Sequence, residues 1–400
     1  MDTKTLLVVP DGMADWEQPS LGDKTPLEVA KTPNLDRLTR QGRLHRLHNI
    51  PKGCPADSAI ANLALLGYDP REYHLGRGPL EALNLGIKFK DGEVAFRCNL
   101  VNVNEHDVLV DYSAGNLRTD IARDLFEDLN KEFGRDGFRF YPGVRYRGVL
   151  VVEGMGDVVC QPPHDEMGEK IQDIFPSGEG SDRLQQMMVE SRDLLENHPI
   201  NMRFKEKGET IANMAWPWGN GVVRDLPSIE DRYGLSGSVV AGVDLINGLS
   251  LAVGFEKREV EGATGDYDTD MEAKGKAAVE ELENHDLVFV HLEAIDEAGH
   301  DGDAELKVEM IERWDRELLK PIVAEYERRD MRIALGPDHY TPIQKRTHID
   351  DPVPFLIVDG DANDDHRFRE SDAEQAPFVE EGWQALAQWY KNDLDNPFQP

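Results

Sequence analysis

The sequence feature that most constrains the fold is a set of three short apolar runs that each lead into an acidic residue. The runs are Leu6–Pro10, Leu287–Leu292 and Arg332–Gly336. The acidic residues that follow them are Asp11, Asp296 and Asp338. Continuous apolar runs of this length are typical of strands buried on both faces of a parallel sheet. Such a sheet gathers the carboxyl ends of its strands at one edge, so we predict an α/β fold with the three carboxylates close together.

Histidines accompany two of these carboxylates. His300 stands four residues after Asp296, so one helical turn places both side chains on the same face. His339 follows Asp338 directly, and His348 comes soon afterwards. Carboxylates and imidazoles together suit Zn²⁺ or a Mn²⁺-like ion. A solvated acidic turn is the alternative for the first pair taken alone, and the second run with its histidines favours a metal site.

A serine at the start of a predicted helix has two interpretations. The Pro- and Gly-rich loop Asn49–Ala56 leads to Asp57 and Ser58, and the helix is expected over Ala59–Leu66. Serine is a preferred N-cap residue, which is a purely structural role. A helix N-terminus also stabilises anions, so the alternative is that Ser58 attacks a phosphoryl group when a metal lowers the pKa of its hydroxyl. Without the metal ligands at the strand ends, the structural cap would be favoured.

The length and order of the segments predict two domains. A chain of 400 residues exceeds the usual size of one compact core. The first strand and the metal strands flank a middle region that mixes strands and helices. We therefore expect residues 1–72 and 251–400 to form one discontinuous domain, and residues 73–250 to form an inserted α+β domain.

Composition narrows the partners and the compartment. A formal net charge of −33 argues against nucleic-acid binding, because phosphate contacts need Lys and Arg. No apolar run is long enough to span a bilayer, so we expect no membrane contact. The N-terminal segment lacks the features of a secretory signal, and three cysteines without CxxC spacing suit a reducing compartment. A cytoplasmic location is expected.

Ordered motifs along nearly the whole chain resemble one family. They include VVPDGMAD, TPLEVAKTPNLDRL, ANLALLGYDP, GRGPLEA, PPHDEMG, WPWGNG, EGATGDYDTD, HLEAIDEAGHDGD and PDHYTP. In this order they resemble the archaeal-type, cofactor-independent (2,3-bisphosphoglycerate-independent) phosphoglycerate mutases of the alkaline phosphatase superfamily. The resemblance implies an alkaline-phosphatase-like sheet with helices on both faces. It also implies a phosphoglycerate mutase that is an isomerase of glycolysis and gluconeogenesis.

The same resemblance implies a binuclear metal site and a covalent intermediate. One ion is expected on Asp11, Ser58, Asp338 and His339, and the other on Asp296, His300 and His348. Mn²⁺ is the preferred ion, with Zn²⁺, Mg²⁺ and Co²⁺ as alternatives that the same ligands accept. No 2,3-bisphosphoglycerate is required. Ser58 is expected to take the phosphoryl group from one hydroxyl of the substrate and return it to the other.

The inserted domain is the expected lid, and its polar residues are candidates for binding the small phosphorylated carboxylate substrate. The candidates in this domain are Arg77, Arg97, Arg147, His164 and Asp165. Lys274, which follows the GATG segment in the other domain, is a further candidate for binding a phosphate. A salt bridge or a buried hydrogen bond is the structural alternative for the first five. For Lys274 the alternative is an exposed lysine on a helix.

Three residues near the expected pocket depart from the pattern of the family. Ala59 and Asn62 stand where relatives often carry an acidic residue and a histidine, and Asn116 stands where Arg or His is common. These departures leave a second hypothesis open, a phosphohydrolase or a phosphotransferase acting on another small alcohol such as homoserine. A non-catalytic, metal-dependent scaffold is a third. The sequence does not indicate the oligomeric state.

Overall fold

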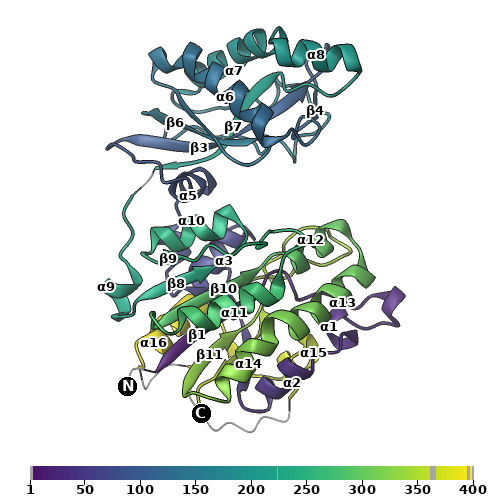
Figure 1. Ribbon diagram of the computed structural model, residues 1–400, viewed down its shortest axis with the longest axis vertical. Coiled ribbons are helices and arrows are strands. Elements are labelled where there is room, and N and C mark those ends of the chain that lie inside the picture. The colour runs from purple at the N-terminus through teal and green to yellow at the C-terminus, as the bar shows by residue number, and fades with distance from the viewer. Residues whose placement is uncertain (1–2, 223, 361–365, 394–396, 399–400) are drawn as a thin grey trace. The chain divides into compact units, whose positions relative to one another are not determined.

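The computed structural model describes residues 3–222, 224–360, 366–393 and 397–398. The chain divides into two compact units (Figure 1). Unit 1 comprises Met1–His74 and Leu226–Pro400, and unit 2 comprises Leu75–Asp225. Unit 2 is therefore an insertion in the sequence of unit 1.

Unit 1 is built on an eight-stranded sheet with the order β13-β2-β12-β11-β1-β10-β8-β9. Its strands are β1 (Lys4–Pro10), β2 (Arg43–Leu47), β8 (Gly237–Val240), β9 (Glu256–Lys257), β10 (Leu287–Leu292), β11 (Met331–Leu335), β12 (Val353–Val358) and β13 (Phe378–Val379). The central strand β1 pairs in parallel with β10 on one side and with β11 on the other. This register brings the carboxyl ends of the three predicted apolar strands to one edge.

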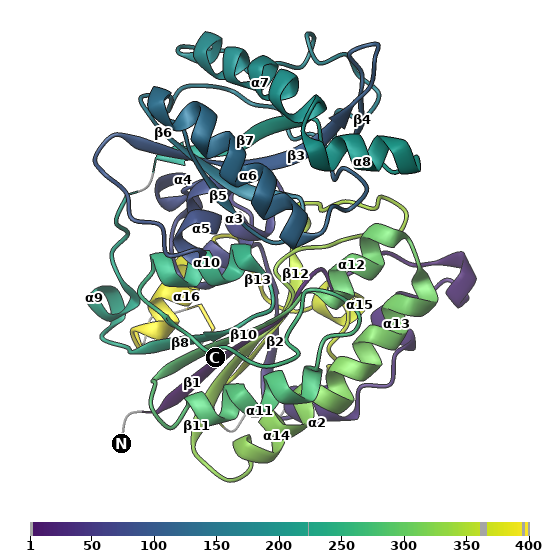
Figure 2. The same cartoon turned by 45° about the horizontal axis from the view of Figure 1, so that its top comes forward.

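Helices cover both faces of this sheet (Figures 1 and 2). On one face lie α1 (Pro26–Val29), α2 (Pro33–Thr39), α11 (Met271–Glu281), α13 (Ala304–Arg313) and α14 (Lys320–Tyr326). On the other lie α3 (Ser58–Leu65), α10 (Asp244–Ala252) and α16 (Gly382–Tyr390). Further helices of the unit are η1 (Pro19–Leu21), α4 (Pro70–Tyr73), α9 (Ile229–Tyr233), α12 (Ala294–Asp301) and α15 (Glu370–Ala373). Leu6 and Val8 of β1 belong to a large apolar core cluster, and the alternating Leu7 and Val9 are buried as well, so both faces of the sheet are covered, as predicted.

Unit 2 is an antiparallel sheet with helices, as expected of an α+β arrangement. Its strands are β3 (Glu93–Val103), β4 (Leu109–Asp111), β5 (Arg139–Pro142), β6 (Arg147–Glu153) and β7 (Met214–Val222). Its helices are α5 (Arg77–Asn84), α6 (Thr119–Phe133), η2 (Gly134–Asp136), α7 (Ser181–Glu196) and α8 (Pro199–Lys207). The strand β3 is almost wholly buried, because β6 and β7 pair with it on both sides and apolar clusters lie on both of its faces.

The later boundary of the inserted region differs from the prediction. Residues 226–250 belong to unit 1 and not to the insertion. The reason is that β8 pairs with β10 in the large sheet and α10 packs on α3. Sequence reasoning missed this because β8 is only four residues long.

Two further features concern the helices of unit 1. The helical segment that begins with α13 is divided by a π-helical turn, η3 (Trp314–Leu319), which ends just before Pro321, as the missing N–H of a proline favours. The closing helix α16 begins at Gly382, because the residues before it form β13 on the edge of the sheet. Among the described residues, no helix combines the length and apolar character needed to cross a bilayer.

Candidate functional site

The structure gathers the seven predicted metal ligands at the carboxyl edge of the unit 1 sheet. Asp11 follows β1, Ser58 opens α3, Asp296 and His300 lie on α12, and Asp338, His339 and His348 follow β11. Six of them form two groups of three, and within each group the potential ligand atoms lie within 4.8 Å of one another. One group is Asp11, Asp338 and His339, and the other is Asp296, His300 and His348.

The first group is completely buried and faces Ser58. His339 Nε2 lies 3.4 Å from Asp11 Oδ1 and 3.4 Å from Asp338 Oδ2. Ser58 Oγ lies 3.1 Å from the same nitrogen. Neither carboxylate oxygen of Asp11 has a hydrogen-bond donor in the part of the chain that the structure describes. A buried carboxylate without donors is costly, and a bound cation would remove that cost.

The second group is formed by one carboxylate and two imidazoles. His300 Nε2 lies 3.1 Å from Asp296 Oδ2 and 2.9 Å from His348 Nε2. His348 Nε2 is 3.6 Å from Asp296 Oδ1. The Thr341 hydroxyl donates to Asp296 Oδ1 and lies 3.2 Å from His339 Nδ1, so it links the two groups.

The charges of these groups also point to bound cations. Burial, followed by the charges of Asp338 and Glu293, raises the pKa of Asp11 well above its usual range. Burial also acts to raise the pKa of Asp296, but hydrogen bonds from His300 and His348 hold it well below its usual range. Several acids and imidazoles packed in one largely buried site fit divalent ions, which the carboxylates and neutral imidazoles would hold.

Ser58 is the first residue of α3 and is not its N-cap. Asp57 takes that role, because its side chain accepts a hydrogen bond from the Ala59 N–H at 2.8 Å. The interpretation of Ser58 as a structural cap is therefore wrong. Its hydroxyl faces His339, at the positive end of the helix dipole.

A glycine allows the two loops of the site to approach each other. Gly12 has a φ of +59°, and a Cβ atom there would lie 2.3 Å from Asp296 Oδ1 and 2.5 Å from Thr341 Oγ1. No side chain fits at such distances. The Asp11-Gly12 pair thus brings the first strand end within reach of Asp296.

Three residues of this site were not predicted to have a role there. Asn62 donates to Asp338 Oδ2 at 2.7 Å and to the Ser58 carbonyl at 2.9 Å, so it orients a predicted ligand. His291 and Glu293 form a further potential ligand group with Asp11. Both could have been found in the sequence, since His291 is the one polar residue of an apolar strand and Glu293 follows that strand directly.

Lys274 is buried on α11, so the alternative of an exposed helix lysine is wrong. Burial lowers its pKa to about 8, while the negative charge of Glu293 partly opposes this. Its ammonium group has no hydrogen-bond partner among the described residues. A buried, unpaired ammonium group is suited to bind an anion.

Unit 2 contains a second cluster, centred on Arg97. Arg97 Nη1 donates to Glu81 Oε1 at 2.7 Å, and its Nε donates to Asn99 Oδ1 at 3.3 Å. Burial lowers the pKa of Arg97 to about 10, partly offset by Glu81 and reinforced by Arg77 and Arg147. The three predicted arginines therefore lie close together.

Aromatic rings line this cluster, and the sequence interpretation overlooked the central one. Trp218 lies 4.9 Å from the Arg97 guanidinium carbon and 5.5 Å from that of Arg77. The His164 ring meets the Trp218 ring edge-on at 5.2 Å. Trp218 belongs to the WPWGNG segment, which carried no functional assignment, although cation–π contacts make tryptophan a natural partner of arginine.

The remaining predicted substrate residues differ in their surroundings. Arg147 begins β6 and lies 5.7 Å from the Tyr146 ring, and its Nε is buried without a partner among the described residues. The side chain of Asp165 is 66% exposed and lies 3.8 Å from His164. Asn116 accepts a hydrogen bond from Arg145 on the surface of unit 2.

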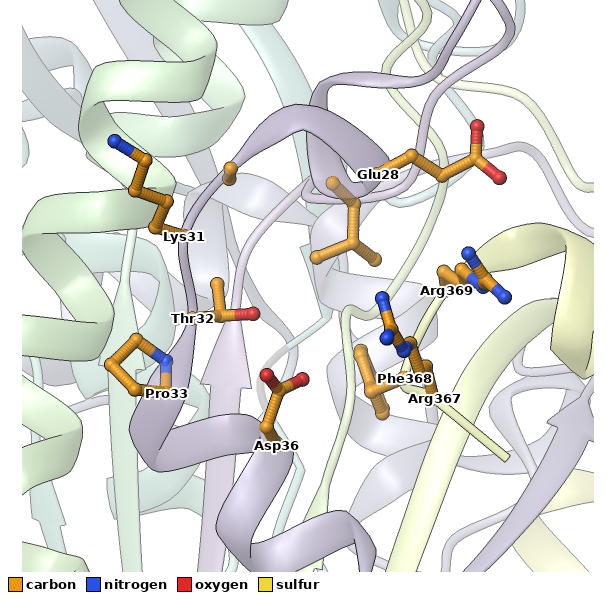
Figure 3. Close-up of a pocket in the computed structure, with 10 residues that line it drawn as sticks. Glu28, Lys31, Thr32, Pro33, Asp36, Arg367, Phe368 and Arg369 are labelled. Carbon is orange, nitrogen blue, oxygen red and sulfur yellow. The ribbon is translucent and has the colours of Figure 1, made fainter. Parts of the chain in front are cut away.

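A pocket of about 330 Å³ lies elsewhere in unit 1 (Figure 3). It is lined by Leu27, Glu28, Ala30, Lys31, Thr32, Pro33, Asp36, Arg367, Phe368 and Arg369. Its charged side chains are of both signs. None of the predicted ligands lines it, so it is not part of the metal site.

Comparison with known proteins gives consistent results. The family model described as 2,3-bisphosphoglycerate-independent phosphoglycerate mutase matches residues 39–201. The chain is 45% identical over 364 residues to 2,3-bisphosphoglycerate-independent phosphoglycerate mutase 2 of Methanothermobacter thermautotrophicus, covering 90% of each chain. It is 44% identical over 357 residues to the enzyme of this name from Methanothrix thermoacetophila, covering 89% of this chain and 90% of the other.

Two solved structures resemble the whole chain. A Pyrococcus horikoshii protein superposes with a TM-score of 0.83 at 30% identity, covering 99% of each chain. The cofactor-independent phosphoglycerate mutase of Thermoplasma acidophilum superposes with a TM-score of 0.64 at 26% identity. That match covers 97% of this chain and 100% of the other.

Proposed function

Because the chain belongs to the family of 2,3-bisphosphoglycerate-independent phosphoglycerate mutases, which are isomerases, we propose that it interconverts 3-phosphoglycerate and 2-phosphoglycerate without a bisphosphoglycerate cofactor. The observation that carries the proposal is the position of Ser58. Its hydroxyl lies at a helix N-terminus, 3.1 Å from His339 Nε2 and beside a buried Asp–His group that fits a metal ion. A cytoplasmic location is part of the same proposal.

We assign the nucleophile to Ser58. In the first half-reaction the Ser58 Oγ–P bond forms while the bond between phosphorus and the substrate oxygen breaks. In the second, the phosphoryl group returns to the neighbouring hydroxyl of the same glycerate. The N–H groups at the start of α3 and the ammonium group of Lys274 bind the phosphoryl oxygens through both steps.

Two divalent ions complete the proposed site, and Mn²⁺ is the preferred one. Asp11, Ser58, Asp338 and His339 would hold one, and Asp296, His300 and His348 the other. Bound ions supply charge that lowers the pKa of the Ser58 hydroxyl and offsets the charge of the phosphoryl group. Asn62 and Thr341 orient Asp338 and Asp296 through their hydrogen bonds.

We assign recognition of the substrate carboxylate to unit 2. Arg77, Arg97 and Arg147 form a group with one carboxylate, Glu81, so positive charge remains for an anion. Trp218 and Asn99 hold the Arg97 guanidinium in place. His164 and Asp165 are kept as candidates, and the role of this unit as a lid stays a prediction.

The test is conversion of 3-phosphoglycerate by chelator-treated protein with and without Mn²⁺, in the absence of 2,3-bisphosphoglycerate. Mn²⁺-dependent formation of 2-phosphoglycerate without free phosphate supports the mutase. Release of phosphate, or transfer to an added alcohol such as homoserine, supports the second hypothesis instead. Asn62 would then be the first residue to study, since it departs from the family beside Ser58.

A further inference from the structure

A lysine outside the ligand groups is completely buried among the loops that carry them. Lys307 lies on α13, the helix that follows α12 and packs against it. Its Nζ lies 2.7 Å from Asp15 Oδ2, and both side chains are completely buried. Neither residue has a role in the reaction proposed above. A buried ion pair adds little stability compared with apolar side chains of similar volume, so stability alone does not explain this pair.

The ammonium group of Lys307 joins two loops that follow neighbouring strands. It donates to Asp15 Oδ2, to the Ala14 carbonyl at 3.4 Å and to the Thr341 carbonyl at 2.9 Å, which gives each of its three N–H groups an acceptor. Ala14 and Asp15 lie in the loop after β1, and Thr341 lies in the loop after β11. The Ile343 N–H also donates to the Asp15 carboxylate. Lys307 and Asp15 together therefore fix the position of Thr341.

Thr341 connects this ion pair to the metal site. Its hydroxyl donates to Asp296 Oδ1 and lies 3.2 Å from His339 Nδ1. Asp296 belongs to one ligand group and His339 to the other. A shift of Thr341 would change the orientation of the Asp296 carboxylate, and the groups that orient a ligand strongly affect metal affinity.

We propose that Lys307 is a positioning residue for metal binding, which holds Thr341 so that the Thr341 hydroxyl orients Asp296 toward an ion. The inference rests on the metal site proposed above, and it does not depend on which phosphate reaction that site catalyses. The hydrogen-bond acceptors of Lys307 in the described part of the chain include no predicted ligand, so Lys307 acts through Thr341. The alternative is that Lys307 and Asp15 only neutralise each other within the fold.

The test is the Mn²⁺ affinity of the chelator-treated full chain, measured by titration calorimetry, together with urea unfolding of the metal-free protein. Lys307→Met should weaken the binding of one Mn²⁺ ion about tenfold. Its free energy of unfolding should also fall, because Asp15 stays buried without its cation. Lys307→Met/Asp15→Asn removes both charges. It should regain most of the lost stability, whereas its Mn²⁺ affinity should remain about tenfold below that of the wild type.

A second pair of variants tests the connection through Thr341. Thr341→Val keeps the shape of the side chain and removes the hydroxyl, so it should weaken Mn²⁺ binding about tenfold as well. Lys307→Met/Thr341→Val should bind no more weakly than Thr341→Val alone, because residues that act through one contact have effects that do not add. Thr341→Ser keeps the hydroxyl and should retain the wild-type affinity.

The matched control is another Lys–Asp pair of unit 1, at the opposite end of β1. Lys4 Nζ lies 3.1 Å from Asp286 Oδ1. Lys4 is the first residue of β1, whereas the predicted ligands follow the last residue of that strand and of its neighbours. Lys4→Met should therefore retain the wild-type Mn²⁺ affinity.

Three results overturn the proposal. They are wild-type affinity in Lys307→Met, recovery of wild-type affinity in Lys307→Met/Asp15→Asn, and a loss of about a hundredfold in Lys307→Met/Thr341→Val, which would show independent effects. If Lys307→Met does not fold, the variant without both charges supplies the measurement. A wild type that binds Mn²⁺ without converting 3-phosphoglycerate rejects only the proposed reaction. Mn²⁺-dependent conversion with wild-type affinity in Lys307→Met rejects only the role of Lys307.

Discussion

Unit 1 buries a carboxylate that lacks hydrogen-bond donors, whereas unit 2 buries a guanidinium group that is already paired. Asp11 has no hydrogen-bond donor among the described residues, and burial raises its pKa. Arg97 instead contacts Glu81, Asn99 and the Trp218 ring. From this difference we expect the first cluster to require bound cations for activity, and the second to be preorganised for an anion.

The largest expected effect tests whether the chemical step belongs to unit 1. Ser58→Ala should lower turnover by at least about 10⁴-fold, because the nucleophile is lost while the fold is unchanged. The measurement is conversion of 3-phosphoglycerate to 2-phosphoglycerate. Ser181, the buried first residue of α7 in unit 2, provides the matched control Ser181→Ala, which should remain active. An active Ser58→Ala protein would refute the assigned nucleophile.

The next effect tests the role assigned to unit 2. Arg97→Met should raise KM about 100-fold, since a charge-assisted contact to the substrate carboxylate is lost. The number of bound Mn²⁺ ions should not change, because Arg97 lies in the other unit. The control is Arg139→Met, which removes a more exposed arginine of the same sheet that pairs with Glu93. An unchanged KM would show that Arg97 has a structural role only.

A smaller effect tests the close approach of loops in unit 1. Gly12→Ala should weaken Mn²⁺ binding about tenfold to hundredfold, because the new methyl group displaces Asp296. Gly22→Ala is the matched control. Gly22 has a φ of +72°, and a Cβ atom added there would have no neighbour within 4 Å among the described residues. The two variants share the cost of positive φ and differ only in crowding. Equal Mn²⁺ affinities, measured by titration calorimetry, would contradict the steric account.

Part of the site could be predicted from the sequence, because acidic residues that follow parallel strands gather at one edge of the sheet. Asp11 and Asp338 were found because parallel strands bring their carboxyl ends together, and the structure confirms that they meet. Glu293 also follows a parallel strand directly. It was not predicted as a ligand, because the four-residue spacing of Asp296 and His300 favoured those two residues instead. Trp218 could not be found by such a rule, because its contacts with Arg77 and Arg97 depend on antiparallel pairing within unit 2.

The end of the inserted unit likewise depends on tertiary pairing that local sequence patterns do not show. Long apolar strands such as β10 are visible in the sequence, since six consecutive buried residues leave a clear pattern. The strand β8 is too short to leave such a pattern in the sequence and is recognised only by its pairing with β10. Local patterns therefore predicted the centre of the sheet, and tertiary pairing decided where the insertion ends.

The smallest expected effect concerns how unit 1 tolerates a buried acid outside the metal site. Glu370 accepts hydrogen bonds from the Asp15 N–H and the Thr25 hydroxyl. Burial nevertheless raises the pKa of Glu370 from 4.5 to about 7, although these hydrogen bonds lower it. Between these two values the folded state keeps a proton that the unfolded state has lost. The free energy of unfolding should therefore fall as the pH rises from about 4.5 to about 7.

Glu370→Gln should remove this part of the pH dependence, which has a limiting slope of about 1.4 kcal/mol per pH unit within the window. The measurement is urea unfolding of both proteins at several pH values, followed by the difference between their unfolding free energies. Glu374→Gln, an exposed position at the end of the same short helix, should leave the slope as in the wild type. If wild type and Glu370→Gln have parallel profiles, Glu370 is ionised in the folded state. Its negative charge would then be stabilised by the hydrogen bonds from Asp15 and Thr25. Glu370 of unit 1 would then be a buried charge with partners, as Arg97 is in unit 2.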